Sequence, residues 1–210
     1  MFEHVTLRTL FFCNQSKMII PNSEALHTVF CSRASVHHNA DEDFRSGKVV
    51  CPDCGGQLKI NLTYSRHYKD SEGEKHDGWV AQGYCRGCNS YHSALPDFLM
   101  PHKHYEASVI EAALAEAEEK GSYNISSCHA WASTVRRWDK QFRERGADAA
   151  GWLLSILFTV YDRCISVIKL HEKWLLKQLA IIAKEFPAAS GGGAIGRVNI
   201  VLTGHKCGFL

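Results

Sequence analysis

Two Cys-x-x-Cys pairs constrain the fold of this chain more than any other feature. The pairs are Cys51-Pro-Asp-Cys54 and Cys85-Arg-Gly-Cys88, with residues 55–84 between them. One such pair is compatible with redox or metal chemistry. Two pairs supply the corners of a tetrahedral site, because each forms a tight turn that directs two sulfurs at one ion about 2.3 Å away. Zn²⁺ suits this set best, since it accepts four soft ligands and needs no open position. Disulfides or free thiols are the alternative interpretation.

The residues between and after the pairs have the pattern of a small antiparallel sheet. The residues that alternate along one face of a first strand are Leu58, Ile60, Leu62 and Tyr64. A polar turn over 71–78 and a returning strand over 78–84 bring the second pair back to the first, and 91–95 adds a short third strand. A unit of this size buries too little apolar area to fold alone, so metal binding is expected to supply folding free energy. We therefore predict a zinc ribbon over residues 48–101.

Helical periodicity begins after the ribbon. Residues 104–120 place their apolar side chains on one side, and Gly121 ends this first helix. The polar stretch 122–132 has room for a turn and a short second helix around 126–130. Ser133 is expected to cap a further helix that continues to Arg145. Together these elements predict a helix-turn-helix-like unit over residues 102–146.

The helix from Ser133 to Arg145 is strongly basic outside one apolar stripe. The stripe consists of Val135, Trp138 and Phe142. Five Arg and Lys side chains against two acids occupy the other faces, in a chain whose formal net charge is only +2. In a helix-turn-helix the first residues of such a helix read base edges, while flanking cations hold phosphates. The predicted DNA-binding residues are Ser133, Thr134, Arg136, Arg137, Lys140 and Arg143. A solvated basic helix without a ligand is the alternative.

The order of these motifs resembles an uncharacterised bacterial family. The resemblance is carried by Cys51-Pro-Asp-Cys54-Gly-Gly, Tyr84-Cys85-Arg-Gly-Cys88, the run from Tyr91 to Ala107, and Ser133-Thr-Val-Arg-Arg-Trp138. That family has a zinc ribbon followed by a helix-turn-helix and is similar to the N-terminal parts of some transposases. The resemblance covers roughly residues 48–145. It implies zinc at the four cysteines and DNA contact through the basic helix, and it implies no established activity.

The rest of the chain is expected to flank this unit. Residues 1–47 are a lead-in of strand and loop, with translation starting at Met1 or at Met18. After a break at Gly146–Gly151, residues 147–187 form a helical pair that bends near Leu170–His171 and packs on itself or on a second copy. Residues 188–210 begin with a Gly-rich spacer and form a flexible tail, in which 197–202 is a last strand or frays. The predicted fold class is α+β.

Several functional classes lack support in the sequence. The chain has no P-loop, Gly-x-Ser-x-Gly or His-Glu-x-x-His motif, so we expect no enzymatic activity. Nine cysteines without a secretory signal, and apolar runs too short for a bilayer, favour a cytoplasmic protein without membrane contact. The predicted function is zinc-dependent DNA binding, as a regulator or accessory factor of a mobile element, with DNA, a transposase or a second copy as partner. A rubredoxin-like iron or zinc tetrathiolate redox protein and a protein-interaction ribbon are the alternatives.

Overall fold

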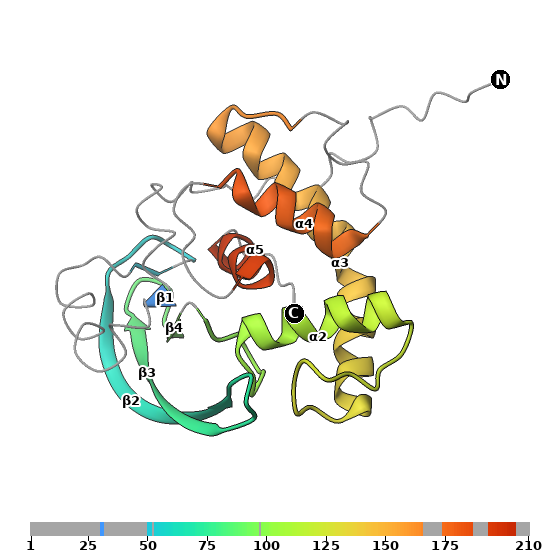
Figure 1. Cartoon of the computed structure of the whole chain (residues 1–210). Helices are drawn as coiled ribbons and strands as arrows, with labels where there is room; N and C mark the ends of the chain where they lie inside the picture. The colour runs from blue at the N-terminus through green and yellow to red at the C-terminus, as the bar shows by residue number, and fades with distance from the viewer. Residues whose placement is uncertain are drawn as a thin grey trace.

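A small sheet followed by helices makes up this α+β fold, in agreement with the predicted class (Figure 1). The computed structural model describes residues 30–31, 50–51, 53–96, 98–165, 174–186 and 193–204. Three antiparallel strands form the ribbon: β2 (Leu58–Lys69), β3 (Lys75–Cys85) and β4 (Ser90–Pro96). A short strand, β1 (Phe30–Cys31), joins β4 in parallel, so the order in the sheet is β1-β4-β3-β2. The three predicted ribbon strands are confirmed.

A bulge in β2 makes the sheet bury apolar side chains on both faces. The register slips between Ile60 and Leu62, which leaves Asn61 without a partner on β3. One extra residue reverses the inward and outward alternation of a strand. Leu58 therefore packs with the cysteines, whereas Tyr64 packs with Val80 on a second cluster and Leu62 is exposed. The expectation of one continuous face from Leu58 to Tyr64 is wrong for this reason.

Four helices follow the sheet in the part of the chain that the structure describes. They are α2 (Ala107–Lys120), α3 (Ala132–Tyr161), α4 (Leu175–Lys184) and α5 (Gly193–Gly204). As predicted, α2 ends at Gly121, which adopts the left-handed conformation at φ 61°. The predicted stripe of Val135, Trp138 and Phe142 is buried in the main core. No helix within the described ranges is long and apolar enough to cross a membrane.

The predicted short helix around residues 126–130 does not form. Residues 121–131 are turns and bends, and the carboxylate of Glu116 on α2 accepts the backbone N–H groups of Ser126 (2.8 Å) and Ser127 (2.6 Å). These bonds fix the serine-rich segment against α2 in a non-helical conformation, which is the usual effect of such side-chain competition. Ser133 is not the cap either, because the helix begins one residue earlier, at Ala132, after Trp131.

The predicted break at residues 146–151 is also absent. Helix α3 is continuous there, and Gly146 is buried within it. A Cβ atom at this glycine would lie 2.4 Å from Cδ2 of Leu175, so the glycine permits α4 to approach α3 closely. The predicted helical pair is therefore formed by the second half of α3 with α4. Its expected bend near Leu170 lies outside the described residues.

The prediction of a flexible tail is wrong for residues 193–204. Helix α5 lies in the middle of the molecule, between the sheet and α4 (Figure 1), and it also contacts α2 and α3. Ile195 and Leu202 are fully buried in the main core, and Ile200 packs on Val80 of the sheet. The N-terminus of α5 is held by Glu111 of α2, whose carboxylate accepts the N–H of Ile195 at 3.0 Å. Burial overrides the strand preference of this Ile- and Val-rich sequence.

Candidate metal centre

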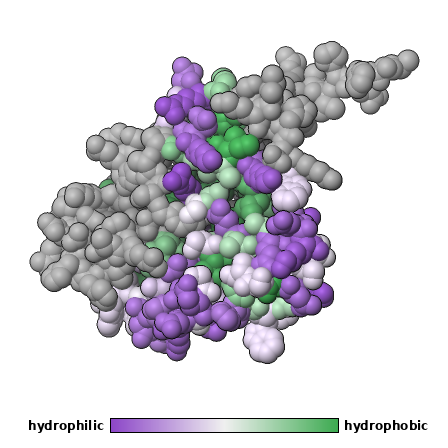
Figure 2. Space-filling view, in the orientation of Figure 1, coloured by the Kyte–Doolittle hydropathy of each residue, from purple (hydrophilic) through white to green (hydrophobic). Residues whose placement is uncertain are grey.

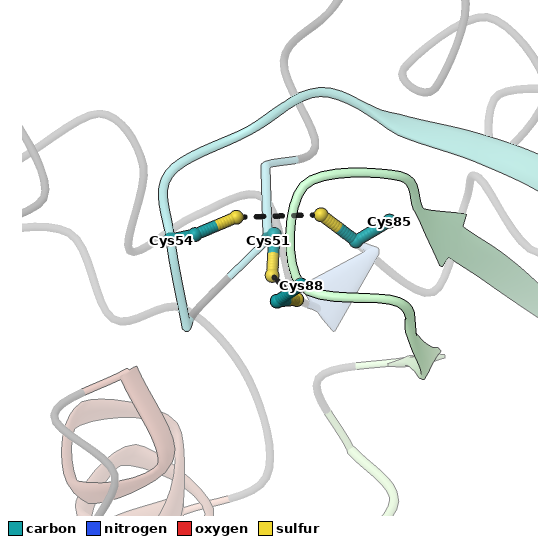
Figure 3. Close-up of side chains that lie close together, drawn as sticks. All are labelled: Cys51, Cys54, Cys85 and Cys88. Carbon is teal, nitrogen blue, oxygen red and sulfur yellow. Dashed lines mark hydrogen bonds between the residues drawn. The ribbon is translucent and has the colours of Figure 1, made fainter.

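Four thiols from two turns meet at one end of the ribbon (Figure 3). Cys51 and Cys54 precede β2, Cys85 ends β3, and Cys88 lies in the turn before β4. The register places Leu58 opposite Cys85, which brings the second pair next to the first. All four sulfurs lie within 4.8 Å of one another. The structure thus brings together all four predicted metal ligands.

The sulfur separations are too long for disulfides and lie close to the edge lengths of a tetrahedral metal site. Cys54 and Cys85 have their Sγ atoms 3.3 Å apart, and Cys51 and Cys88 have theirs 3.4 Å apart. A disulfide requires about 2.05 Å. A tetrahedron with metal–sulfur bonds of about 2.3 Å has edges of about 3.8 Å. All four cysteines are free thiols, so the disulfide interpretation is wrong for them.

Two glycines make room for the sulfurs. A Cβ atom at Gly56 would lie 3.2 Å from the Sγ of Cys54, and one at Gly87 would lie at the same distance from that sulfur. Both separations are tighter than ordinary contacts, so a side chain at either position would crowd the thiols. The residues present therefore fit a thiophilic tetrahedral ion. Zinc and iron both accept four thiolates, so the donor set does not select between them.

The thiols of this cluster differ in how readily they ionise. Burial raises the pKa of Cys51 to about 12, which disfavours its thiolate. Cys85 has its pKa lowered to about 7, chiefly because the backbone N–H of Cys88 donates to its sulfur. Four sulfurs so close to one another cannot all carry negative charge unless a positive ion compensates them. Metal binding at this site is therefore expected to release protons.

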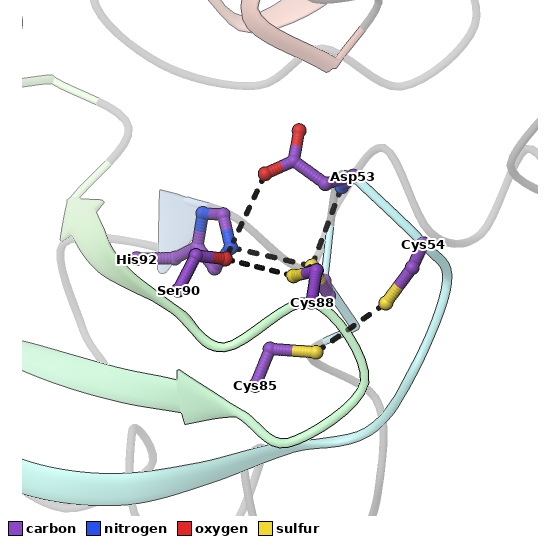
Figure 4. Close-up of polar contacts among 7 residues, drawn as sticks. Asp53, Cys54, Cys85, Cys88, Ser90 and His92 are labelled. Carbon is purple, nitrogen blue, oxygen red and sulfur yellow. Dashed lines mark hydrogen bonds and ion pairs between the residues drawn. The ribbon is translucent and has the colours of Figure 1, made fainter.

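Three further polar residues adjoin the thiols on the side of Cys51 and Cys88 (Figure 4). His92 and Ser90 project from β4, and Asp53 lies inside the first Cys-x-x-Cys turn. Nε2 of His92 lies 3.2 Å from the Sγ of Cys51. Our sequence reasoning missed these residues. The available signal was the alternation of a strand, which puts Ser90 and His92 on the face of the sheet that Cys88 approaches.

The predicted DNA-binding residues lie on the first turns of α3. Ser133, Arg136, Arg137, Lys140 and Arg143 are exposed, and Thr134 is half-buried. Two of the cations already have anionic partners within the helix. The Nε of Arg143 donates to both carboxylate oxygens of buried Asp139 at 2.9 Å, and Nζ of Lys140 lies 3.8 Å from Glu144.

Tyr123 connects this face of α3 to the segment before it. Its hydroxyl donates to Asp139 at 2.8 Å, and the guanidinium of Arg136 lies over its ring, 5.3 Å from the centroid. The same segment borders an open cavity of about 530 Å³ whose lining includes Tyr123, Ser126 and Trp131. Trp131 is 82% exposed, an unusual state for a tryptophan.

A second basic cluster adjoins the predicted one. Arg137, Gln141 and Arg145 follow one another at spacings of four along α3, and Lys103 donates a hydrogen bond to Gln141. Burial, together with the positive charges of Arg137 and Arg145, lowers the pKa of Lys103. The predicted DNA-binding residues did not include Lys103 or Arg145. The spacing of four residues along the helix could have indicated Arg145. Lys103 lies in the loop after β4, and no sequence pattern indicated that it approaches α3.

Comparison with known proteins gives one match. Residues 51–138 match the model of a family described as a domain of unknown function, DUF6431. This range contains all four cysteines and the first turns of α3, and the description names neither transposases nor helix-turn-helix proteins. No curated protein and no solved structure matches the chain.

Proposed function

We propose that this protein is a metal-dependent DNA-binding protein, in which a tetrathiolate centre holds the ribbon and α3 presents a basic face to the phosphate backbone. The gathering of Lys103, Arg137 and Arg145 is the observation that supports the proposal most directly. Cations gathered on one face of a helix produce a positive potential that attracts anionic partners. DNA phosphates are such a partner.

The two sides of α3 have different roles in this proposal. Arg143 has a structural role, because its guanidinium is paired with the carboxylate of Asp139. Arg137 and Arg145, with Lys103, bind phosphates. Ser133, Thr134 and Arg136 lie beside exposed Trp131 at the start of the helix, where a helix in the major groove presents base-reading side chains.

The segment between α2 and α3 takes the place of the expected short helix. Glu116 and Tyr123 hold residues 121–131 against α2 and α3, so this segment sets the orientation of α3. Figure 2 shows hydrophilic side chains over the region of α2 and α3, with apolar surface in patches between the helices. The resemblance to the N-terminal parts of some transposases favours a regulator or accessory factor of a mobile element. The proposal includes no catalytic step.

Salt-dependent binding to duplex DNA tests this function. We expect Arg137→Ala and Arg145→Ala each to weaken binding to any duplex and to lower the slope of log affinity against log salt by about one unit. Lys184→Ala is the matched control, because Lys184 is an exposed cation on α4. The Lys184→Ala variant should have the same affinity for duplex DNA, and the same slope of log affinity against log salt, as the wild type.

Two results would redirect the proposal. Metal-loaded protein without salt-sensitive binding to any duplex at low ionic strength would favour the protein-interaction ribbon instead. A red protein with the visible absorption of iron bound to four thiolates would favour the rubredoxin-like redox alternative, because zinc is colourless.

A further inference from the structure

A histidine stands beside the edge of the metal site formed by Cys51 and Cys88 (Figure 4). Nε2 of His92 lies 3.2 Å from the Sγ of Cys51 and 2.9 Å from the Oγ of Ser90. The Oγ of Ser90 is in turn 2.8 Å from the Sγ of Cys88. The ring nitrogen therefore faces the sulfurs of Cys51 and Cys88, at separations that ligands of one ion can have.

His92 also belongs to a second set of metal-ligating atoms. Cys51, Asp53, Cys88 and His92 each offer a ligand atom, and these four atoms lie within 4.8 Å of one another. The His92 side chain is 18% exposed, so it is held near the thiols and not extended into solvent. Three thiolates with one imidazole form a structural zinc site as ordinary as four thiolates.

Among the thiols near His92, Cys88 is the one suited to leave. Cys51 is buried and packs with Leu58 and Cys85 in the ribbon core. Cys88 is exposed and lies outside that core cluster, and the turn that carries it includes Asn89 at φ 56°. Loss of the Cys88 thiolate would therefore leave the packing of the ribbon intact.

We propose that His92 is a reserve metal ligand that takes the position of Cys88 when the Cys88 sulfur no longer binds the ion. The resulting set is Cys51, Cys54, Cys85 and His92. In this exchange the bond between a bound metal and the Cys88 sulfur would break, and the lone pair of Nε2 would form the new bond while Nδ1 keeps the ring proton. The released thiolate takes a proton from water, and a site with a divalent ion changes its net charge from −2 to −1. The inference rests on the metal-binding part of the proposed function.

Four variants of the full chain test it, each loaded with Zn²⁺ and dialysed against a weak chelator. We expect Cys88→Ala to keep one ion per chain and the Cys88→Ala/His92→Ala double variant to lose it. Cys85→Ala is the matched control, with one thiolate removed at a position where no histidine of the described residues joins a ligand group, and it should lose the ion. His92→Ala alone should keep it. Melting temperature reports whether each variant folds.

Cobalt provides a second readout on Cys88→Ala. Replacement of a thiolate by imidazole should lower the sulfur-to-cobalt charge-transfer absorption by about a quarter, since one of four thiolates is lost, and should shift the ligand-field bands to shorter wavelength. Metal loss from Cys88→Ala would overturn the inference, and so would equal retention by the single and double variants. A His92→Ala variant that cannot hold metal would overturn it as well. Wild-type protein that binds no ion would instead refute the metal centre itself.

Discussion

Two carboxylates on α2 and α3 fix the segment that places the basic helix. Asp139 is buried and accepts hydrogen bonds from Tyr123 and Arg143. Glu116 accepts both backbone and hydroxyl donors of the segment and pairs with Lys120 one turn later. Each carboxylate joins the segment 121–131 to a helix, so a substitution at either position tests whether these bonds hold the segment in place.

The acid dependence of stability should reveal the role of Glu116. The hydrogen bond from Lys120, followed by those from Ser127 and Ser126, holds the pKa of this carboxyl far below its usual range. A depressed carboxyl pKa stabilises the fold above the unfolded pKa of about 4.3, and this contribution disappears as the pH falls further. We expect Glu116→Gln to melt below the wild type at pH 7, with the difference shrinking below about pH 4.

Glu119→Gln is the control for this prediction, because Glu119 is exposed on the same helix. Its melting temperature should follow that of the wild type at every pH. A Glu116→Gln deficit of the same size at pH 7 and pH 3.5 would show that the carboxylate charge is not what holds the segment.

Substitutions at two glycines test how the start of α5 docks against α2. Gly193 begins α5 with φ at 76°, and a Cβ atom there would lie 2.3 Å from Oε2 of Glu111. Gly151 lies inside α3 in open space, with nothing near its missing Cβ atom. We expect Gly193→Ala to lose at least about 1 kcal/mol of stability because of the left-handed backbone and the crowded carboxylate.

Gly151→Ala should raise the stability of the protein, in contrast to Gly193→Ala. Alanine in an exposed helix interior is about 1 kcal/mol more favourable than glycine. Chemical denaturation measures both variants. Equal effects of the two substitutions would mean that the start of α5 is not held against Glu111.

The ribbon was predictable because its constraints are local. Cys-x-x-Cys spacing, alternating apolar residues and a polar turn all lie within residues 51–96, and each points to the same hairpin. The bulge at Asn61 was not predictable, since an extra residue in a strand alters the facing of its neighbours without altering their identity. The prediction consequently placed Leu58 and Tyr64 on one face, although they pack on two.

The errors in the helical part come from long-range contacts. Gly146 looked like a break because glycine disfavours helices, but its contact with Leu175 is made by a segment that follows much later in the chain. Residues 193–204 looked like a strand or a tail because of their glycines and β-branched residues. Their helix exists because the sheet, α2, α3 and α4 together bury it.

The ribbon and the basic face of α3 are connected through Arg66. This residue lies on β2, and its Nη2 donates to the carbonyl oxygens of Met100, at 2.7 Å, and of Lys103. Lys103 in turn donates to Gln141 on α3. The ribbon therefore positions the loop that carries one cation of the proposed DNA-binding face.

This connection predicts that metal and DNA bind cooperatively. Removal of the metal should loosen the ribbon, displace the loop at Lys103 and weaken duplex binding. Because coupling between two sites is reciprocal, saturating duplex DNA should raise the affinity for the metal by the same factor. Metal competition with a chelator, with and without duplex, measures that factor.

Arg66→Met should abolish the coupling without removing the metal. The substitution breaks both carbonyl contacts but leaves the four thiols unchanged, so the protein should keep one ion per chain and bind duplex more weakly. Lys59→Met removes the same charge from an exposed position on β2 and serves as the control. If the two variants lose the same amount of affinity for duplex DNA, Arg66 affects binding only through its charge. If Arg66→Met alone is weak and its affinity no longer responds to the metal, the path from the metal centre to α3 runs through this side chain.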